Sequence, residues 1–196
     1  FLPDPVRARV QIQHRTGDRP GAVSDMKASE INMSKQPWEY RPSSHKNQWR
    51  QQDRVIFLGE KSQAAIVPWL RPGAQGQFLF QPTVAEVRRR ERMRKARKTP
   101  LKPSDKARQV KRKQAGTRAA FRDRYDTTTY AQAIRRACKR AGVEVWTPNR
   151  LRHLVATETR EKHGIEAASA VLGHRQVETT QIYSANSESK AKKLAE

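Results

Sequence analysis

The sequence has almost no cysteine, no long apolar run and few acidic residues. Cys138 is the single cysteine among 196 residues, which excludes an intrachain disulfide and a cysteine-ligated zinc site. We expect it to be a small core residue. No run approaches the roughly 18 apolar residues that span a bilayer, and the first residues lack the layout of a signal peptide. The expectation is therefore a soluble, cytoplasmic protein. Because the chain begins with Phe1 rather than Met, we also expect it to be a fragment.

The shortage of acidic residues leaves the chain strongly basic. There are 19 Asp and Glu against 41 Lys and Arg, which gives a formal net charge of +22. Such an excess indicates a polyanionic partner, with nucleic acid as the first candidate. Hydrophobic residues make up only 35% of the chain, so part of it is expected to stay unpacked.

The first eighty residues alternate between helical and strand-like patterns. Val6, Val10 and Ile12 indicate a helix that Thr16-Gly17 ends. The further elements predicted here are a shorter helix from Pro20 through Val23, Met26 and Ile31, antiparallel strands over Trp38–Tyr40 and Arg54–Leu58, a helix over Lys61–Leu70, and a third strand over Gln77–Phe80.

The segment from Val84 to Tyr125 holds 17 Lys and Arg against 4 Asp and Glu. We predict a basic helix over Val84–Lys98, a mobile loop over Thr99–Phe121, and therefore a partly disordered insertion over 84–125. One interpretation is a solvated linker, and the other is an arm that contacts DNA phosphates. The candidate DNA contacts are Arg88, Arg89, Arg90, Lys111, Arg112 and Lys113.

Two further helices precede a group of chemically suggestive residues. Asp126-Thr127-Thr128 can cap a helix that ends at Gly142, and Thr147-Pro148 opens another that stops near Gly164. The group itself consists of Arg152, His153, His174 and Tyr183. Arginine binds phosphate oxygens with two parallel hydrogen bonds, and a tyrosine among such cations is suited to attack phosphorus.

The order and spacing of these residues resemble a known family. The runs T-P-N-R-L-R-H over 147–153, L-G-H over 172–174 and T-Q-I-Y over 180–183 are similar to the C-terminal signature of the tyrosine recombinase (phage integrase) family. Upstream, T-G-D-R-P-G over 16–21 is similar to the turn that carries the family's first arginine, here Arg19. Lys46, between the two predicted strands, matches the family's catalytic lysine. The runs around Trp38 and Leu58 also resemble integrase-like proteins of planctomycete type.

The sequence departs from the family pattern at two positions. Asn149 stands where the family has His or Lys, and an amide donates a hydrogen bond but cannot move a proton at neutral pH. Ala22 stands where the family usually has Glu, which removes a carboxylate from the first motif.

The resemblance implies site-specific recombination of DNA without metal, cofactor or ATP. Tyr183 would attack the scissile phosphate and form a 3′-phosphotyrosyl link. Arg19 and Arg152 would hold the non-bridging oxygens. His174 would bind the phosphate or accept the tyrosine proton, and Asn149 would donate a neutral hydrogen bond. Lys46 would protonate the leaving 5′-oxygen. We expect His153 to have a structural role.

The resemblance also implies an architecture: a mainly helical catalytic domain with a small antiparallel sheet over residues 1–183, and a tail over 184–196. The family's N-terminal core-binding domain would be missing from this fragment. The implied partner is double-stranded DNA, bound as a homo-tetramer on paired sites, with no membrane involved. Two alternatives stay open, namely a catalytically impaired DNA-binding relative and a basic RNA-binding protein.

Overall fold

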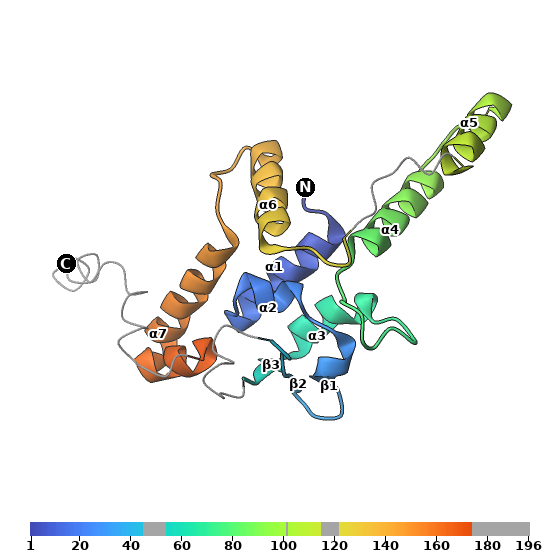
Figure 1. The fold of residues 1–196 in the computed structure, drawn as a ribbon. Coiled ribbons are helices and arrows are strands. Elements are labelled where there is room, and N and C mark those ends of the chain that lie inside the picture. Colours follow the sequence, from blue (N-terminus) through green and yellow to red (C-terminus); the bar gives the residue numbers. More distant parts are fainter. Residues whose placement is uncertain (45–53, 101, 115–121, 174–196) are drawn as a thin grey trace.

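Helix α1 (Asp4–Thr16) runs through the middle of the fold, and helices and a strand from several parts of the chain pack against it (Figure 1). The computed structural model describes residues 1–44, 54–100, 102–114 and 122–173. As predicted, α1 ends at Gly17, which adopts the left-handed conformation with φ 64° and donates its N–H to the carbonyl of Gln13. One face of α1 meets a small sheet and a short helix, and another face meets α7.

The sheet is three-stranded and antiparallel. Its strands, in spatial order, are β1 (Ile31–Asn32), β2 (Trp38–Tyr40) and β3 (Ile56–Leu58). Tyr40 lies opposite Ile31 on one side and Ile56 on the other. Because side chains alternate along a strand, Ile56 and Leu58 point into the core while Phe57 is 62% exposed. The two longer strands confirm the sequence prediction.

The third strand is not where the sequence predicted it. Gln77–Phe80 forms no strand, and only an isolated bridge joins Phe78 to Lys27. Instead, Ile31 pairs as β1, because α2 (Pro20–Ser24) ends after five residues rather than continuing to Ile31. Leu79 and Phe80 are buried, so the apolar run that suggested a strand supplies core side chains from a loop.

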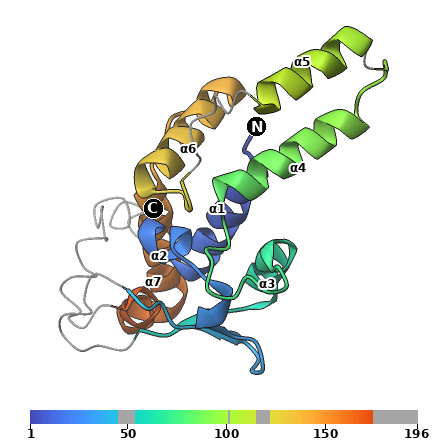
Figure 2. The ribbon, with the colours of Figure 1, turned by 45° about the vertical axis from the view of Figure 1, so that its right-hand side comes forward.

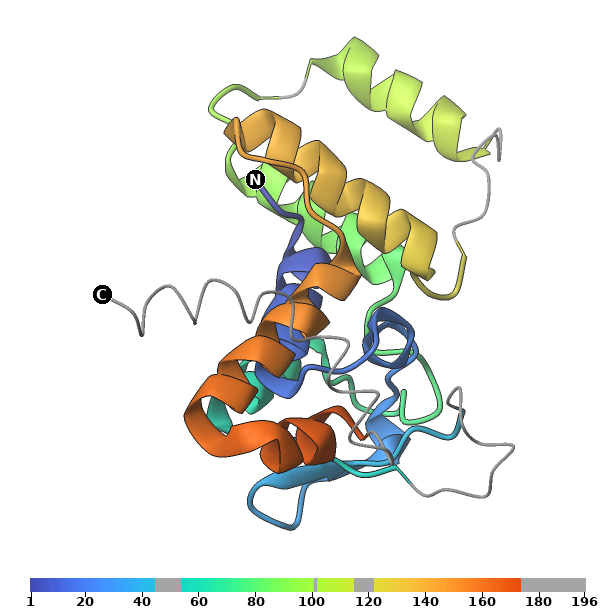
Figure 3. The same cartoon turned by 90° about the vertical axis from the view of Figure 1, so that its left-hand side faces the viewer.

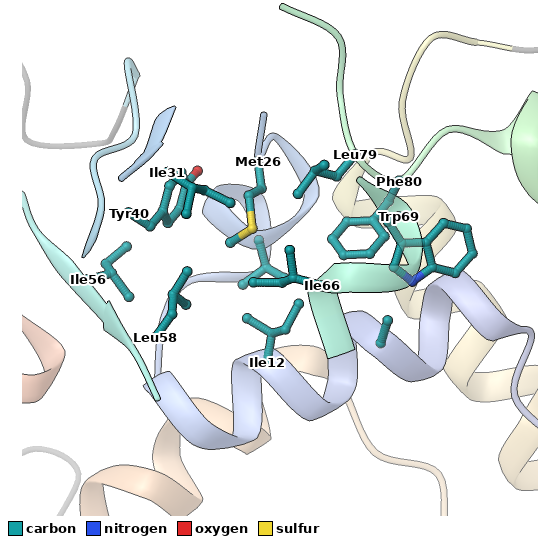
Figure 4. Close-up of a cluster of buried hydrophobic side chains, with 12 residues drawn as sticks. Ile12, Met26, Ile31, Tyr40, Ile56, Leu58, Ile66, Trp69, Leu79 and Phe80 are labelled. Atoms are coloured by element: carbon teal, nitrogen blue, oxygen red, sulfur yellow. The ribbon is translucent and has the colours of Figure 1, made fainter. Parts of the chain in front are cut away.

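The main core lies between the sheet, α1 and helix α3 (Glu60–Ile66) with its 3-10 extension Val67–Trp69 (Figure 4). Trp69 and Phe80 meet edge to face with ring centroids 5.6 Å apart. The buried side chains labelled in this cluster are Ile12, Met26, Ile31, Tyr40, Ile56, Leu58, Ile66, Trp69, Leu79 and Phe80.

A second core cluster joins α1 to α6 (Thr127–Ala141) through Val6, Tyr130, Ile134 and Cys138. The predicted cap is present, since the Asp126 side chain accepts the N–H of Thr129. Helix α6 ends at the predicted Gly142, and Cys138 is buried as expected.

Helix α7 (Pro148–Leu172) lies along α1 and carries its last turns toward the sheet (Figure 3). Gly164 has φ 87° inside it, so the helix breaks there, at the predicted stop, and resumes at a new angle. This bend directs Ala168 and Leu172 into the interior.

Helices α4 (Pro82–Lys95) and α5 (Pro103–Gln114) form an arm that projects from the body (Figure 1). In Figure 2, α4 extends away from the body of the protein, and α5 runs back in the opposite direction on the outer side of α4. No residue of α4 is buried. Helix α4 confirms the predicted basic helix. Helix α5 overturns the loop prediction over residues 103–114, because this run has no Gly and its one Pro stands at the first helical position.

The protein is thus mostly helical with one small antiparallel sheet, as the sequence predicted. Within the described ranges, no helix is both long enough and apolar enough to cross a bilayer.

Candidate active site

The turn that follows α1 carries Arg19, the first predicted catalytic residue. Its backbone is fixed locally, because the hydroxyl of Thr16 donates to the carbonyl of Ile12 at 3.0 Å and accepts the N–H of Asp18 at 3.3 Å. Arg19 then adopts an extended conformation, with φ −68° and ψ 144°, and begins helix α2. Its side chain is partly exposed, while Asp18 beside it is buried.

Gly17 allows this turn to sit against α7. A Cβ atom at this position would lie 2.9 Å from Cγ1 of Val155 and 3.2 Å from Cδ2 of Leu172. The left-handed backbone conformation is also one that side chains other than glycine adopt only at a cost. A small residue at 17 is therefore a condition for the close approach of this turn to α7.

Arg152 lies in the first half of α7 and reaches this turn. It is 3% exposed, and its two terminal nitrogens donate to the carbonyls of Gly17 and Leu172, both at 2.9 Å. These carbonyls lie at the C-terminal ends of α1 and α7, where the helix dipoles concentrate partial negative charge. One guanidinium thus binds two helix ends and fixes the segment before Arg19 relative to the segment before His174.

Arg54, just before β3, completes this arrangement and was not singled out from the sequence. Its guanidinium forms an ion pair with Asp18 at 2.7 Å and donates to the carbonyl of Leu172 at 2.9 Å. A Cβ at Gly173 would lie 2.0 Å from Nη1 of Arg54, so a larger residue there would displace this guanidinium. An arginine at the start of an apolar strand gives no sequence signal that distinguishes this role from surface exposure.

Gln13 is a second contributor that the sequence analysis missed. Its buried amide donates to the carbonyls of Asp18 and Pro148, both at 3.0 Å, and accepts the hydroxyl of Tyr130 at 3.0 Å. One side chain of α1 therefore joins the Arg19 turn, the start of α7 and helix α6. Both amide hydrogens and the amide oxygen have partners, which satisfies the group fully.

The structure brings Arg19 and Arg152 to the same turn and leaves Asn149 nearby at the start of α7. Asn149 is exposed, one residue after the Pro148 carbonyl that Gln13 binds. Lys46, His174 and Tyr183 lie outside the described residues. The described chain ends at Gly173, immediately before His174, and there it is held by Arg54 and Arg152 through Leu172.

Comparison with known protein families identifies the family of this chain. The profile of the phage integrase family matches residues 3–190. The chain belongs to this family. Neither this match nor the solved structures below support the finer resemblance to planctomycete-type integrases.

Solved recombinases share the fold. A structure of XerA recombinase matches with a TM-score of 0.61 and 21% identity, over 97% of this chain and 55% of that one. A structure of XerH bound to difH substrate matches with a TM-score of 0.55 and 12% identity, over 98% of this chain and 46% of that one. A structure of XerH bound to palindromic difH substrate matches with a TM-score of 0.60 and 14% identity, over 97% of this chain and 44% of that one. This chain therefore spans about half the length of these proteins. A search of curated proteins finds no match.

Ala22, which departs from the family pattern, takes part in a hydrogen bond through its main chain. At Ala22, the backbone carbonyl accepts the hydroxyl of Tyr40 at 2.9 Å. Burial raises the pKa of Tyr40 well above its usual value, so this hydroxyl stays a donor at every physiological pH. The turn of this integrase-family chain is thus tied to strand β2 without a carboxylate at position 22.

His153 follows Arg152 on α7. Partial burial of the ring, together with the neighbouring Arg152 cation, lowers the pKa of His153, so the neutral imidazole prevails at pH 7. Its carbonyl accepts the hydroxyl of Thr157 at 3.0 Å. A neutral ring adds no second positive charge next to Arg152.

The predicted DNA contacts of the arm lie at the other end of α1 from this site. Arg88 donates to the carbonyl of Pro68 and stacks on Trp69, with 4.4 Å from Cζ to the ring centroid. Arg89 and Arg90 form ion pairs of 2.7 Å with Glu86, and these lower the pKa of Glu86 to about 2. Lys111 is exposed, whereas the side chains of Arg112 and Lys113 lie outside the described residues.

Proposed function

We propose that this chain is the catalytic domain of a site-specific DNA recombinase that cuts and rejoins DNA through a 3′-phosphotyrosyl intermediate. The observation that carries the proposal is the convergence of Arg19 and Arg152, which are distant in sequence, on one turn beside the segment that leads to His174. Arg19 follows the turn whose Gly17 carbonyl Arg152 binds, so we propose a phosphate site there, and family membership supplies the tyrosine chemistry.

The proposed reaction is an exchange of one phosphodiester for another. The Tyr183 oxygen bonds to phosphorus and the bond from phosphorus to the 5′-oxygen breaks, so no bond energy is lost. Arg19 and Arg152 stabilise charge on the non-bridging oxygens, and one such donor is typically worth about 3–4 kcal/mol in the transition state. His174 accepts or shares the tyrosine proton, Lys46 protonates the leaving 5′-oxygen, and Asn149 adds a neutral hydrogen bond.

The proposed substrate is double-stranded DNA, bound as a tetramer on paired sites. The net charge of +22 favours a polyanion, and XerH, which shares the fold, is solved bound to a difH substrate. Because the solved recombinases are about twice as long, we propose that a core-binding part accompanies this domain when it closes around DNA.

A second candidate is a DNA-binding relative with impaired catalysis. Two observations favour it: the exposed Asn149 cannot transfer a proton at neutral pH, and Ala22 offers only its carbonyl. Both candidates bind DNA, and only the first forms a covalent link.

Covalent capture distinguishes the two candidates. The protein is mixed with nicked suicide DNA substrates built from candidate attachment sites, and a denaturant-resistant protein–DNA band is sought. The recombinase gives a band that Tyr183→Phe abolishes while non-covalent binding remains. A band that survives Tyr183→Phe would disprove the assignment of the nucleophile.

Asn149→His tests the impaired-catalysis candidate directly. If the amide limits proton transfer, the histidine variant yields more covalent complex than the parent chain on the same substrate. If covalent complex is absent from both, although both bind the substrate, the chain is a binding protein rather than a recombinase.

A further inference from the structure

We propose that residues 93–100 and 102–114, here called the arm tip, bind the phosphates of duplex DNA at a place separate from the catalytic turn. This inference rests on the proposed function, since it takes DNA as the substrate. The arm tip comprises the last turn of α4, the connecting residues and α5 (Figure 2).

The arm tip carries a concentrated charge of one sign. It holds ten Lys and Arg and a single acidic residue, Asp105. Every side chain whose exposure is described in this range is exposed, from Met93 to Lys111. For Arg94, Lys95 and Arg97, no side-chain hydrogen bond or ion pair to any other described residue is present. Nothing in the described fold neutralises this charge.

The root of the arm differs from its tip, because its arginines are already paired. Arg89 and Arg90 bind Glu86, and Arg92 binds Asp4 at 2.9 Å. The returning segment repeats this pattern: Arg124 pairs with Asp25 at 2.7 Å, and Arg122 pairs with Asp126. These five arginines at the root therefore each have a carboxylate partner, whereas Arg94, Lys95 and Arg97 have none among the described residues.

The same contacts anchor the arm to the body. Besides its ion pairs, the root is held by Arg88 on Trp69 and by Arg9, which lies between the rings of Tyr125 and Tyr130 at 4.4 and 4.2 Å. A groove of about 780 Å³ lies at this junction, and its arginines are the paired ones just named. The side chains of the root therefore attach the arm to the body, and the side chains of the tip are available to an external partner.

The arm and the catalytic turn lie at opposite ends of α1. Arg92 meets Asp4 in the first turn of this 13-residue helix, and Gly17 follows its last turn. At 1.5 Å per residue the helix is about 20 Å long, which corresponds to about six base pairs of B-DNA. The arm tip therefore binds phosphates well removed from the scissile one, and it contributes to affinity without contributing to phosphoryl transfer.

Salt dependence tests the assignment, because each phosphate contact releases counterions. The variant Arg94→Gln/Lys95→Gln/Arg97→Gln is compared with Arg135→Gln/Arg136→Gln/Lys139→Gln on α6. Both variants remove two arginines and one lysine from exposed helical or near-helical positions. Non-covalent binding to one duplex is measured over a range of salt concentrations, and circular dichroism verifies that both variants remain folded.

The arm variant is expected to lower the slope of log Kobs against log[salt] by up to about 2.7, which is about 0.9 for each phosphate that the variant leaves without its cation, while the α6 variant leaves the slope unchanged. Equal slopes for the arm variant and the parent chain would overturn the proposal, as would equal losses in both variants. Stronger dependence on the arm for single-stranded RNA than for the duplex would also overturn it.

The outcome does not depend on covalent chemistry. Covalent capture at Tyr183 is measured at saturating protein, where the arm variant is expected to match the parent chain. A chain that forms no covalent complex but shows the arm-dependent slope would contradict the recombinase proposal alone. A chain that forms covalent complex with an unchanged slope would contradict the arm proposal alone.

Discussion

At the residue scale, Gly17 combines two requirements that can be separated experimentally. Both Gly17 and Gly142 end helices with φ near 65°, but a Cβ at 17 would meet Val155 and Leu172, while a Cβ at 142 would meet nothing within 4 Å. Gly142→Ala is expected to cost about 1–2 kcal/mol for the left-handed conformation alone. Gly17→Ala is expected to cost more, because Val155 must also move. Chemical denaturation of the two variants measures this difference. Equal losses of unfolding free energy would mean that α7 shifts to accommodate the added methyl group at no measurable cost.

Arg54 is expected to stabilise the fold as strongly as a core residue. Arg54→Met would leave the buried carboxylate of Asp18 without its ion-pair partner, and the loss of one member of a buried pair typically costs about 3–5 kcal/mol. The exposed pair between Arg7 and Asp4 is the control, since Arg7→Met is expected to cost about 1 kcal/mol or less. Urea denaturation compares the two. Similar small losses would show that Asp18 is readily hydrated.

The sequence identified the residues that bear chemistry better than those that position them. Arg19 and Arg152 could be named as candidates because they belong to motifs with fixed spacing, and their catalytic roles stay predictions. Gln13 and Arg54 could not, because their roles depend on carbonyls that come close only after α1, β3 and α7 have packed. A single glutamine or arginine in an ordinary stretch carries no local sign of such partners.

At the element scale, the structure agrees with the sequence wherever the local signal specified both ends of an element. Helix α6 has a capping aspartate and a terminal glycine, and it forms as predicted. The third strand was misplaced because Gln77–Phe80 and Ile31–Asn32 are both short, and pairing with β2 decides between them. Helix α5 was missed because Pro100 and Pro103 indicated a loop, whereas Pro103 stands at the first position of the helix, where proline is tolerated.

The N-cap of α6 gives a prediction at this scale. Asp126→Ala removes the acceptor of the Thr129 N–H and is expected to lower the free energy of unfolding by about 1 kcal/mol. Asp123→Ala, an exposed neighbour outside the helix, is the matched control and is expected to have little effect. Thermal unfolding followed by circular dichroism measures both. If both variants melted alike, α6 would be held by its packing on α1 rather than by its cap.

At the scale of the whole molecule, buried tyrosines make stability fall at alkaline pH. Burial raises the pKa of Tyr40, Tyr125 and Tyr130, whereas unfolded tyrosine ionises near pH 10. The unfolded state therefore releases protons that the folded state keeps, so stability is complete below about pH 10 and is lost as the pH rises further. Arg9 opposes this trend, because burial lowers its pKa to about 10, but it is one group against three.

Tyr125→Phe tests this account, because it keeps the ring that stacks on Arg9 and removes one titrating group. The slope of stability against pH above pH 10 is expected to be shallower by up to about 1.4 kcal/mol per pH unit. Denaturation between pH 8 and 11 measures it for both proteins. An identical slope in the variant would show that Tyr125 ionises in the folded state.

The way Arg152 is held has a consequence for how this domain can diversify. Two of its partners, the oxygens of Gly17 and Leu172, belong to the main chain and are present whatever side chains evolve there. Apart from the need for glycine at 17, mutation of neighbouring side chains does not delete these two groups, which orient the guanidinium. The arm and the exposed faces can therefore change sequence while the Arg152 guanidinium keeps its place between the ends of α1 and α7.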